Sequence, residues 1–312
     1  MKTVFFPDIH RRLPKSFAKS LEAHGFKILL PDNSFIPHIK YWKKWSKEEL
    51  KNDYMKDVQN VDIISYDELT KKTIDIFFIT CYEVQDDMLK IYNNYGKNSK
   101  LVHYAGNNFV PYDYNKIKNL ITTDEIIFQK ARINKKNALM FFPWVDFDND
   151  YRFEETNNSK NINSYILNYK SFFPQQYQQA IEIKDIFKTK EYNVNFIENE
   201  LETSIPQIMN NSFLTLHIKP IEGYGFSILE SMAKGRPVIL YKPYSENKIY
   251  RHWALDMQTC IYFDNNEELL KKFSIYEKNY QEIQFNCASK IRKLINLDKH
   301  SKNLASFLNN LV

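Results

Sequence analysis

Two glutamates, Glu222 and Glu230, stand eight positions apart around a glycine-rich turn in the C-terminal half of the chain. Gly223 and Gly225 allow the backbone to approach a ligand closely, because glycine has no side chain to obstruct it. A helix that we expect to begin at Phe226 directs its unpaired N–H groups and the positive end of its dipole at the same place. The segment therefore predicts an anion site. One carboxylate lies beside the reacting end of a phosphorylated ligand, and the other is placed to bind a ribose diol.

The residues around this turn indicate the order strand, turn, helix, strand. Phe213–Ile218 and Pro237–Tyr241 are apolar runs of strand length, and Gly235 stands where a helix from Phe226 to Lys234 would end. The chain has only 6 glycines in 312 residues, and three of them lie between positions 223 and 235. The sequence contains neither G-x-G-x-x-G nor G-x-x-x-x-G-K-[ST], which argues against a Rossmann dehydrogenase and a P-loop NTPase.

Residues 222–239 resemble the E-x7-E segment of retaining GT-B glycosyltransferases, closest to glycosyltransferase family 4, also called glycosyl transferases group 1. The two glutamates, both turn glycines, the Met-Ala pair, Gly235 and the following Pro-Val-Ile all match in spacing. The resemblance implies that Glu222 is catalytic and contacts the donor sugar, and that Glu230 binds the donor ribose. It also implies that the donor sugar and diphosphate face the backbone amides of four residues: Gly223, Tyr224, Gly225 and Phe226. A plain strand–helix unit with two exposed glutamates is the alternative, and it does not explain the joint spacing.

Two lysines are further candidates by the same resemblance. The family usually has an Arg/Lys pair after the first strand of the C-terminal domain to hold the diphosphate, and here only Lys170 is available. Lys219 precedes Glu222 by three residues and is a second candidate for the donor phosphates. For both, the alternative is a solvated lysine. The family's glycine-containing strand end is missing near residues 195–200, which leaves the recognition of the base open.

In the N-terminal half, the resemblance points to a histidine at a strand end near the donor sugar. His103 follows an apolar run and precedes a turn with Gly106 and Asn107, so we expect His103 as a second catalytic residue and Asn107 on the acceptor or phosphate side. A buried core histidine is the alternative. The first loop carries Arg11 and Arg12, which are candidates to meet an anionic donor or acceptor; an exposed basic loop is the alternative.

Two other patterns are weaker indications of function. Asp146, Asp148 and Asp150 look like a D-x-D metal motif or the start of an EF-hand, but Tyr151 and Asn157 stand where an EF-hand needs glycine and glutamate. We therefore expect no metal site. The aromatic and basic segment 39–45 fits either a helix that packs its tryptophans inward or a peripheral contact with an anionic membrane, and we favour the helix.

The elements that must position these residues alternate along the chain. Short apolar runs are separated by amphipathic segments, which predicts parallel sheets covered by helices. A polar, turn-rich stretch breaks the pattern after Phe142. We therefore expect an α/β protein of the GT-B class, in which two Rossmann-like domains with parallel sheets face each other across a cleft. The expected divisions are an acceptor-side domain at 1–145, a linker at 146–163, a nucleotide-sugar domain at 164–275, and C-terminal helices at 276–312 that cross back to the first domain.

The composition of the chain limits which class of protein it can be and which partners it can bind. Hydrophobic residues make up 43% and charged residues 26%, as in globular proteins. A net charge of +5, spread along the chain, mildly favours anionic partners such as phosphates but lacks the clustered basic face of a nucleic-acid binder. Three distant cysteines predict buried thiols in a reducing compartment. With no leader-like segment and no apolar run of membrane length, we expect a cytoplasmic protein, with association at the membrane surface as an alternative.

The sequence thus predicts a metal-independent, retaining glycosyltransferase of hexosyl type. The expected donor is a UDP- or GDP-sugar used as substrate, with no cofactor. The acceptor would be a hydroxyl of a glycan or glycolipid, most often in polysaccharide biosynthesis. Two alternatives remain open. One is a GT-B-like protein that binds nucleotide or glycan without turnover, and the other is a nucleotide-sugar epimerase.

Overall fold

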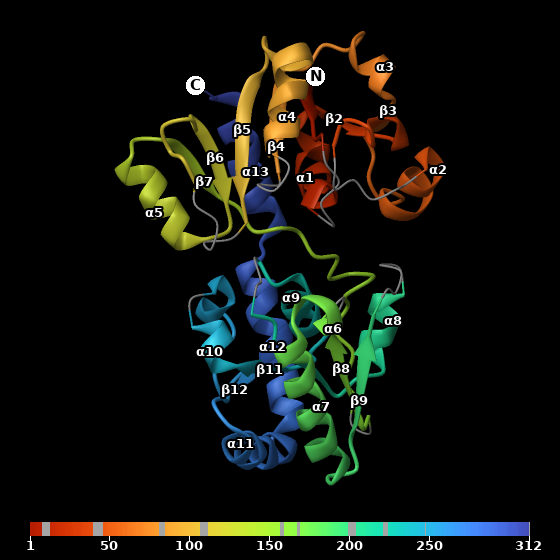
Figure 1. The fold of residues 1–312 in the computed structure, drawn as a ribbon, viewed down its shortest axis with the longest axis vertical. Helices are drawn as coiled ribbons and strands as arrows, with labels where there is room; N and C mark the ends of the chain where they lie inside the picture. Colours follow the sequence, from red (N-terminus) through yellow and green to blue (C-terminus); the bar gives the residue numbers. More distant parts are fainter. Residues whose placement is uncertain are drawn as a thin grey trace. The chain divides into compact units, whose positions relative to one another are not determined.

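The chain forms two compact units (Figure 1). The computed structural model describes residues 1–7, 13–39, 46–80, 85–106, 112–156, 159–166, 169–198, 204–220, 224–246 and 248–311. Unit 1 contains Met1–Trp144 together with Ile295–Val312, and unit 2 contains Val145–Leu294. None of the helices in these described ranges is long and apolar enough to span a membrane.

Unit 1 is built on a parallel sheet in the order β3-β2-β1-β4-β5-β6-β7. Its strands are β1 (Lys2–Phe5), β2 (Phe26–Pro31), β3 (Val61–Ile64), β4 (Ile76–Ile79), β5 (Lys100–Ala105), β6 (Asn119–Thr122) and β7 (Asn137–Met140). Central strands of a parallel sheet are covered on both faces and therefore read as continuous apolar runs. The four residues of β4 are all buried, as this rule requires.

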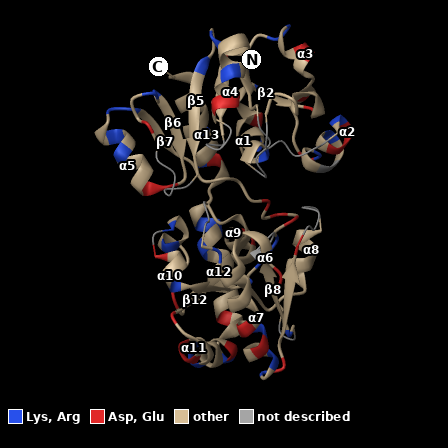
Figure 2. Ribbon diagram, in the orientation of Figure 1, with Lys and Arg blue, Asp and Glu red and all other residues tan. Residues whose placement is uncertain are grey.

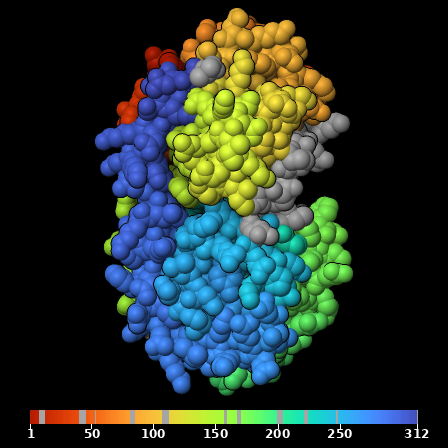
Figure 3. Space-filling view, turned by 90° about the vertical axis from the view of Figure 1, so that its left-hand side faces the viewer, coloured from red at the N-terminus to blue at the C-terminus, as the bar shows by residue number. Residues whose placement is uncertain are grey.

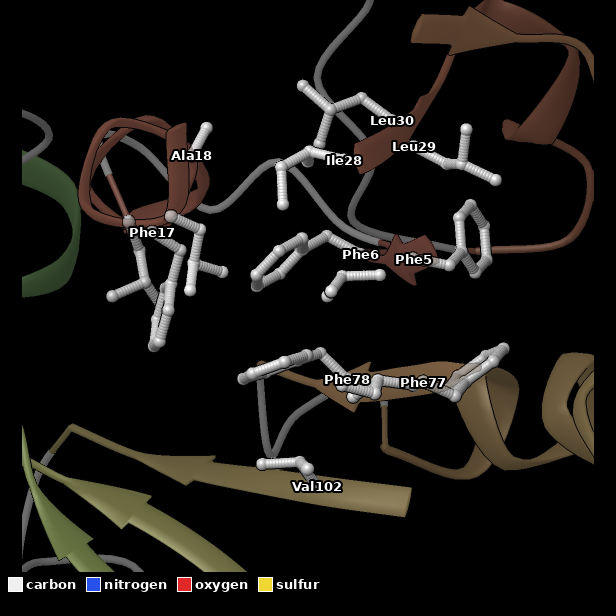
Figure 4. Packing of buried hydrophobic residues seen from close by; sticks show 14 of the residues in the cluster. Phe5, Phe6, Phe17, Ala18, Ile28, Leu29, Leu30, Phe77, Phe78 and Val102 are labelled. Carbon is white, nitrogen blue, oxygen red and sulfur yellow. The ribbon is translucent and has the colours of Figure 1, made fainter. Parts of the chain in front are cut away.

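Aromatic side chains fill the core of unit 1 (Figure 4). Phe6 and Phe78, from the neighbouring strands β1 and β4, stack with ring centroids 4.4 Å apart. On the same face, Phe17 of helix α1 stacks on Phe141 at 4.6 Å. Leu304 of helix α13, near the C-terminus, is buried in the same cluster, so the end of the chain completes this core.

The helices of unit 1 begin and end at recognisable residues. They are α1 (Leu13–Leu21), α2 (Lys47–Glu49), α3 (Tyr66–Leu69), α4 (Gln85–Ile91), α5 (Glu125–Ile133) and α13 (Leu297–Asn309). Helix α1 continues as a 3₁₀ turn that ends at Gly25, whose φ of 72° is the left-handed conformation that glycine adopts readily. Ser46 and Ser65 form capping boxes at the starts of α2 and α3, and the Asp124 carboxylate caps α5.

Unit 2 is a smaller parallel sheet in the order β12-β11-β10-β8-β9. Its strands are β8 (Asn161–Tyr165), β9 (Asn193–Ile197), β10 (Leu214–His217), β11 (Val238–Tyr241) and β12 (Cys260–Phe263). Its helices are α6 (Tyr169–Phe172), α7 (Pro174–Lys188), α8 (Ile205–Asn210), α9 (Phe226–Ala233), α10 (Lys242–Ser245), α11 (Asn266–Lys278) and α12 (Tyr280–Leu294). In Figure 1, α7 lies in front of the sheet and α12 lies behind it.

The expected linker is partly a strand. Strand β8 begins at Asn161, three residues before the expected domain start, and residues 145–160 group with unit 2. The polar composition concealed this strand because its asparagines are satisfied locally. The Asn195 amide of β9 lies 3.3 Å from the Asn161 side chain and 3.4 Å from that of Asn163, and Asn163 donates to the Ile208 carbonyl.

Other elements also differ from the sequence expectation. Residues 248–255 read as a helix, but the structure has only a 3₁₀ turn at Ile249–His252. Strand β3 was not expected, since Asp62 interrupts its apolar run; this carboxylate pairs with Lys27 on β2 at 2.7 Å. At the C-terminus, α12 belongs to unit 2 and α13 to unit 1, so the chain returns to unit 1 at Ile295 rather than at residue 276.

Candidate functional site

The sheet of unit 2 has a topological switch point between β8 and β10. From β8 the chain first adds β9 on one side, and then adds β10, β11 and β12 on the other. In open parallel sheets, the loops at such a point diverge and leave room for a ligand beyond the carboxyl ends of the strands. The loop after β8 leads to α6, which carries Lys170, and the loop after β10 carries Lys219 and leads to α9. The topology therefore brings both lysines and the start of α9 to one edge of this sheet.

Helix α9 begins directly after Gly225, which has φ 76° and ψ 52°. The amides of Ile228 and Leu229 both donate to the Gly225 carbonyl, each at 3.0 Å. The amides of Phe226 and Ser227 precede these first helical bonds, and such amides at a helix start have no carbonyl partner within the helix. They and the helix dipole form an electropositive end that faces the switch point.

A group of buried side chains packs against the turn at Gly225. A Cβ atom on Gly225 would lie 3.0 Å from the Tyr250 ring, so the turn rests directly on that ring. Tyr250 lies edge-on to His217 at 5.9 Å and to Trp253 at 6.2 Å. The His217 Nδ1 atom is 3.5 Å from the Ser227 hydroxyl at the start of α9. These contacts fix the position of the first turn of α9.

The structure places the predicted donor-side residues as follows. Glu230 and Tyr224 are each only 4% exposed, and the Tyr224 ring lies edge-on to Phe226 at 5.4 Å. Lys170 is exposed on α6, and Lys219 is partly buried two residues beyond β10. Glu222 and Gly223 lie outside the described residues. Of the predicted glutamates, the structure thus reports on Glu230, which is on the first two turns of the helix that follows the glycine turn.

Unit 1 has its own switch point, between β1 and β4, because β2 and β3 lie on one side of β1 and the later strands on the other. The loop after β1 contains Arg11 and Arg12, which lie outside the described residues, as does Asn107 after β5. Thr80 follows β4 at this edge and is 5% exposed. The edge is the one that general rules for parallel sheets favour for a ligand.

His103 lies on β5, opposite Ile79 of β4 and Leu120 of β6 in the register of the sheet. Its side chain is 5% exposed, and burial lowers the pKa of His103 to about 4. The imidazole is therefore neutral at pH 7. Its Nδ1 atom and the Thr80 hydroxyl are both buried without a hydrogen-bond partner in the described part of the chain. Such groups are rare in folded proteins. Here one directly follows β4, and the other lies two residues before the end of the neighbouring strand β5.

Comparison with known proteins then decides the fold. No family model and no curated protein matches the chain in sequence. The chain is similar to many solved structures, and three that cover nearly all of it illustrate the likeness. Anabaena HepE, in complex with UDP and glucose, has a TM-score of 0.66 at 11% identity over 100% of both chains. Sucrose-phosphate synthase from Thermosynechococcus elongatus has a TM-score of 0.64 at 10% identity over 100% of this chain and 99% of its own. The catalytic domain of starch synthase IV from Arabidopsis thaliana, bound to ADP and acarbose, has a TM-score of 0.60 at 9% identity over 99% of both chains.

The chain has the GT-B fold. Its two parallel sheets of seven and five strands, covered by helices, agree with these neighbours, and the fold class expected from the sequence is confirmed. At 9–11% identity the likeness concerns the path of the backbone. The chemistry of this GT-B chain must therefore be argued from its own residues.

Sequence reasoning identified Gly235 as the residue that ends α9, but not the contacts that hold this end of the helix. Gly235, with φ 76°, ends the helix: its amide donates to the Met232 carbonyl at 2.9 Å, and the Arg236 amide donates to the Ser231 carbonyl at 2.8 Å. This is the Schellman arrangement. A Cβ on Gly235 would lie 2.5 Å from the Phe153 ring, so glycine is required here for space as well as for φ.

Arg236 is 1% exposed and joins three segments of unit 2. Its guanidinium donates to the Glu154 carbonyl at 2.6 Å, to the Asn210 carbonyl at 3.2 Å and to the Gln284 side chain on α12 at 3.3 Å. Burial lowers the pKa of Arg236 from its ordinary value. In the sequence, the only sign of this role is that a basic residue, Arg236, follows the helix-ending Gly235. Nothing in the sequence showed which carbonyls Arg236 would bind.

The aspartates at 146–150 make a turn. The Asp146 carboxylate accepts hydrogen bonds from the amides of Asp148 at 3.2 Å and Asn149 at 3.1 Å. Side chains of this kind bond to the backbone two or three residues on and thereby stabilise a turn. The Asp146 side chain thus has a structural role in this turn.

Proposed function

We propose that the protein is a glycosyltransferase that moves a sugar from a nucleoside-diphosphate sugar to a hydroxyl of a glycan or glycolipid. The observation that carries the proposal is the start of α9. In a chain with the GT-B fold, this helix begins at a left-handed glycine beside the switch point of unit 2. Its position matches the glycine turn of the E-x7-E segment, whose second glutamate, Glu230, is buried on the same helix.

The donor would bind to unit 2. The amides at the start of α9 supply neutral donors and a positive dipole end for the diphosphate, and Lys219 and Lys170 supply cations at the same edge. Glu230 would accept hydrogen bonds from the ribose hydroxyls. The HepE structure contains UDP and that of starch synthase IV contains ADP, which supports a nucleotide-linked donor. We propose a UDP- or GDP-sugar.

Catalysis would rest on electrostatic stabilisation by positioned groups. As the bond to the diphosphate breaks, negative charge grows on the leaving group, and the α9 amides are already oriented toward it. Glu222 would contact the donor sugar. His103, neutral at pH 7, would exchange a hydrogen bond with a sugar hydroxyl without adding a charge. We propose that the reaction retains the anomeric configuration, transfers a hexose-type sugar and needs no metal ion.

Unit 1 would provide the acceptor side. Arg11 and Arg12 follow β1, one of the two strands that border the switch point of this unit, and Asn107 follows β5, the next strand beyond β4. A polar acceptor or its phosphate would meet them at this edge. A role in polysaccharide biosynthesis, a cytoplasmic location and a peripheral contact with an anionic membrane belong to the same proposal. Residues 39–45 lie almost entirely outside the described ranges.

A thermal-shift screen tests donor binding. UDP, GDP, ADP and their sugars are added in turn, since a ligand that binds only the native state raises the midpoint of unfolding. We expect one base to raise the midpoint, and we expect Glu230→Ala to remove most of that gain. Glu267→Ala, which changes another helical glutamate far along the chain, is the control. A gain that survives Glu230→Ala would contradict the ribose role.

Two product measurements test the finer claims. NMR of the product is expected to show the same anomeric configuration as the donor sugar, and activity is expected to persist in a chelator. Conversion of the nucleotide sugar without an acceptor would instead indicate an epimerase. Tight nucleotide binding with neither transfer nor hydrolysis would indicate a binding protein.

A further inference from the structure

Helix α5 of unit 1 presents apolar and cationic side chains on the side that faces away from the sheet. Ile127 and Ala131 are buried against the core around Leu120. Ile126, Lys130 and Ile133 stand at positions i, i+4 and i+7, and so share the outer side of the helix. Ile126 is 48% exposed and Ile133 is 79% exposed. Two large aliphatic side chains, with a lysine between them, thus share the exposed side of a helix that already buries another face.

The end of α5 is strongly cationic (Figure 2). Lys130, Arg132, Lys135 and Lys136 fall within seven residues, and Lys118 is joined to this end because the Asn137 amide donates to its carbonyl at 3.0 Å. Within the described ranges, none of these five cations forms an ion pair, although Arg132 lies over the Phe128 ring at 5.7 Å. Eight lysines elsewhere do pair with carboxylates: Lys15, Lys19, Lys27, Lys90, Lys116, Lys160, Lys242 and Lys272.

The nearby acids do not neutralise this surface. Glu125 accepts a hydrogen bond from the Gln129 side chain, Asp124 caps the helix, and Asp113 pairs with Lys116 at 3.5 Å. Cations near a helix C-terminus also offset the helix dipole, and this accounts for Lys130 and Arg132. It does not account for Lys135 and Lys136 beyond the helix, or for an isoleucine 79% exposed among them.

From these observations we infer that the outer side of α5 docks the protein on an anionic lipid bilayer. The docking surface consists of Ile126, Lys130, Ile133, Lys135 and Lys136. The isoleucines would enter the boundary between headgroups and acyl chains, and the lysines would bind lipid phosphates. A nucleic acid would use the cations and leave the isoleucines in water, whereas the chemistry of a bilayer satisfies both. The segment around α5, yellow-green in Figure 3, forms open surface on the side that the figure shows.

The inference is independent of the proposed sugar transfer, because its readout is binding to lipid. The full chain is sedimented with vesicles of phosphatidylcholine alone or mixed with phosphatidylglycerol. We expect binding to the mixed vesicles only, and weaker binding as ionic strength rises, because salt screens the attraction. Failure to bind the mixed vesicles at low ionic strength would overturn the inference.

Two sets of variants test the surface itself. The apolar set is Ile126→Ser with Ile133→Ser, and the cationic set is Lys130→Gln, Lys135→Gln and Lys136→Gln. Each set is expected to weaken binding by about tenfold or more, because it removes buried apolar area or lipid-facing charge. The matched controls act on unit 2: Phe285→Ser, an aromatic side chain 63% exposed, and the exposed lysines in Lys188→Gln, Lys190→Gln and Lys278→Gln. Both controls are expected to bind as the wild type does.

Two other results would contradict the inference. Equal losses in the cationic set and its control would show attraction by net charge, without a docking surface. Binding of single-stranded RNA that depends on the lysines but not on the isoleucines, with no vesicle binding, would assign the surface to nucleic acid. Unchanged thermal unfolding of the variants ensures that a loss of binding reports on the surface.

Discussion

Two individual side chains near the candidate ligand edges, one in each unit, have environments that a sequence alone does not reveal. His103 and Glu230 are polar residues held at 5% and 4% exposure. Burial of such groups costs free energy unless a partner satisfies them, so their presence at the ligand edge of a sheet needs a reason. The sequence singled out both residues, but it left open whether His103 is a core residue. Its unsatisfied Nδ1 atom favours a functional role over plain packing.

The burial of His103 predicts a loss of stability in mild acid. Its pKa is about 4 in the folded chain against an ordinary value near 6.5, so the unfolded chain binds the proton more readily. The contribution is present above about pH 6.5 and is lost as the pH falls toward 4. At pH 5 the loss amounts to on the order of 2 kcal/mol. Denaturant unfolding at pH 7.5 and pH 5 is expected to show a smaller difference for His103→Gln than for the wild type. Equal differences would mean that His103 is not held neutral by the fold.

Gly225 and Gly25 give a matched pair of glycine substitutions. Both have positive φ, at 76° and 72°, so alanine strains the backbone at either position by roughly 1–2 kcal/mol. A new Cβ meets nothing within 4 Å at Gly25, but lies 3.0 Å from the Tyr250 ring at Gly225. We expect Gly25→Ala to lower stability alone, and Gly225→Ala to weaken nucleotide binding by about tenfold as well, because it displaces the start of α9. Calorimetric titration measures this. Equal nucleotide affinities in the two variants would mean that the start of α9 does not bind the nucleotide.

At the scale of elements, the sequence predicted parallel sheets covered by helices, and its errors in single elements have physical causes. Alternating apolar runs identified the central strands, because parallel strands buried on both faces have little freedom in composition. Strand β3 was missed because Asp62, which pairs across the strand with Lys27, breaks its apolar pattern. The start of β8 was missed because the Asn161 and Asn163 amides find partners in the neighbouring strand and helix. Such pairings depend on the tertiary structure and leave no local signal.

Arg236, at the C-terminal end of α9 and distant from the ligand edge, is expected to contribute strongly to the stability of unit 2. Arg236→Ala leaves the carbonyls of Glu154 and Asn210 without this donor and opens a cavity between α9 and α12. We expect a loss of about 3–5 kcal/mol in the free energy of unfolding. Arg251→Ala, which removes one exposed bond to the Glu246 carbonyl, is expected to cost within about 0.5 kcal/mol. Denaturant unfolding compares them, and a similar small loss for both would show that Arg236 does not hold these segments together.

At the scale of the whole molecule, the sequence predicted the α/β class and the GT-B fold through one segment of about twenty residues. The division of the chain into two units was harder to predict from the sequence. The helices at the C-terminus look alike in composition, yet α12 packs on α9 in unit 2 and α13 packs on α1 in unit 1. The aromatic core that Leu304 completes comes from strands near the N-terminus, so the destination of α13 depends on contacts distant in sequence.

Transfer of a labelled sugar is the most direct test of the central claim. The full chain is incubated with the nucleotide sugar whose base raises its thermal midpoint, together with a panel of glycan and glycolipid acceptors, and radioactivity in the acceptor is counted. We expect transfer by the wild type and a loss of about 100-fold or more in Glu222→Gln and in Glu230→Ala, with both variants folded. Transfer that persists in both variants, or hydrolysis alone with every acceptor, would contradict it.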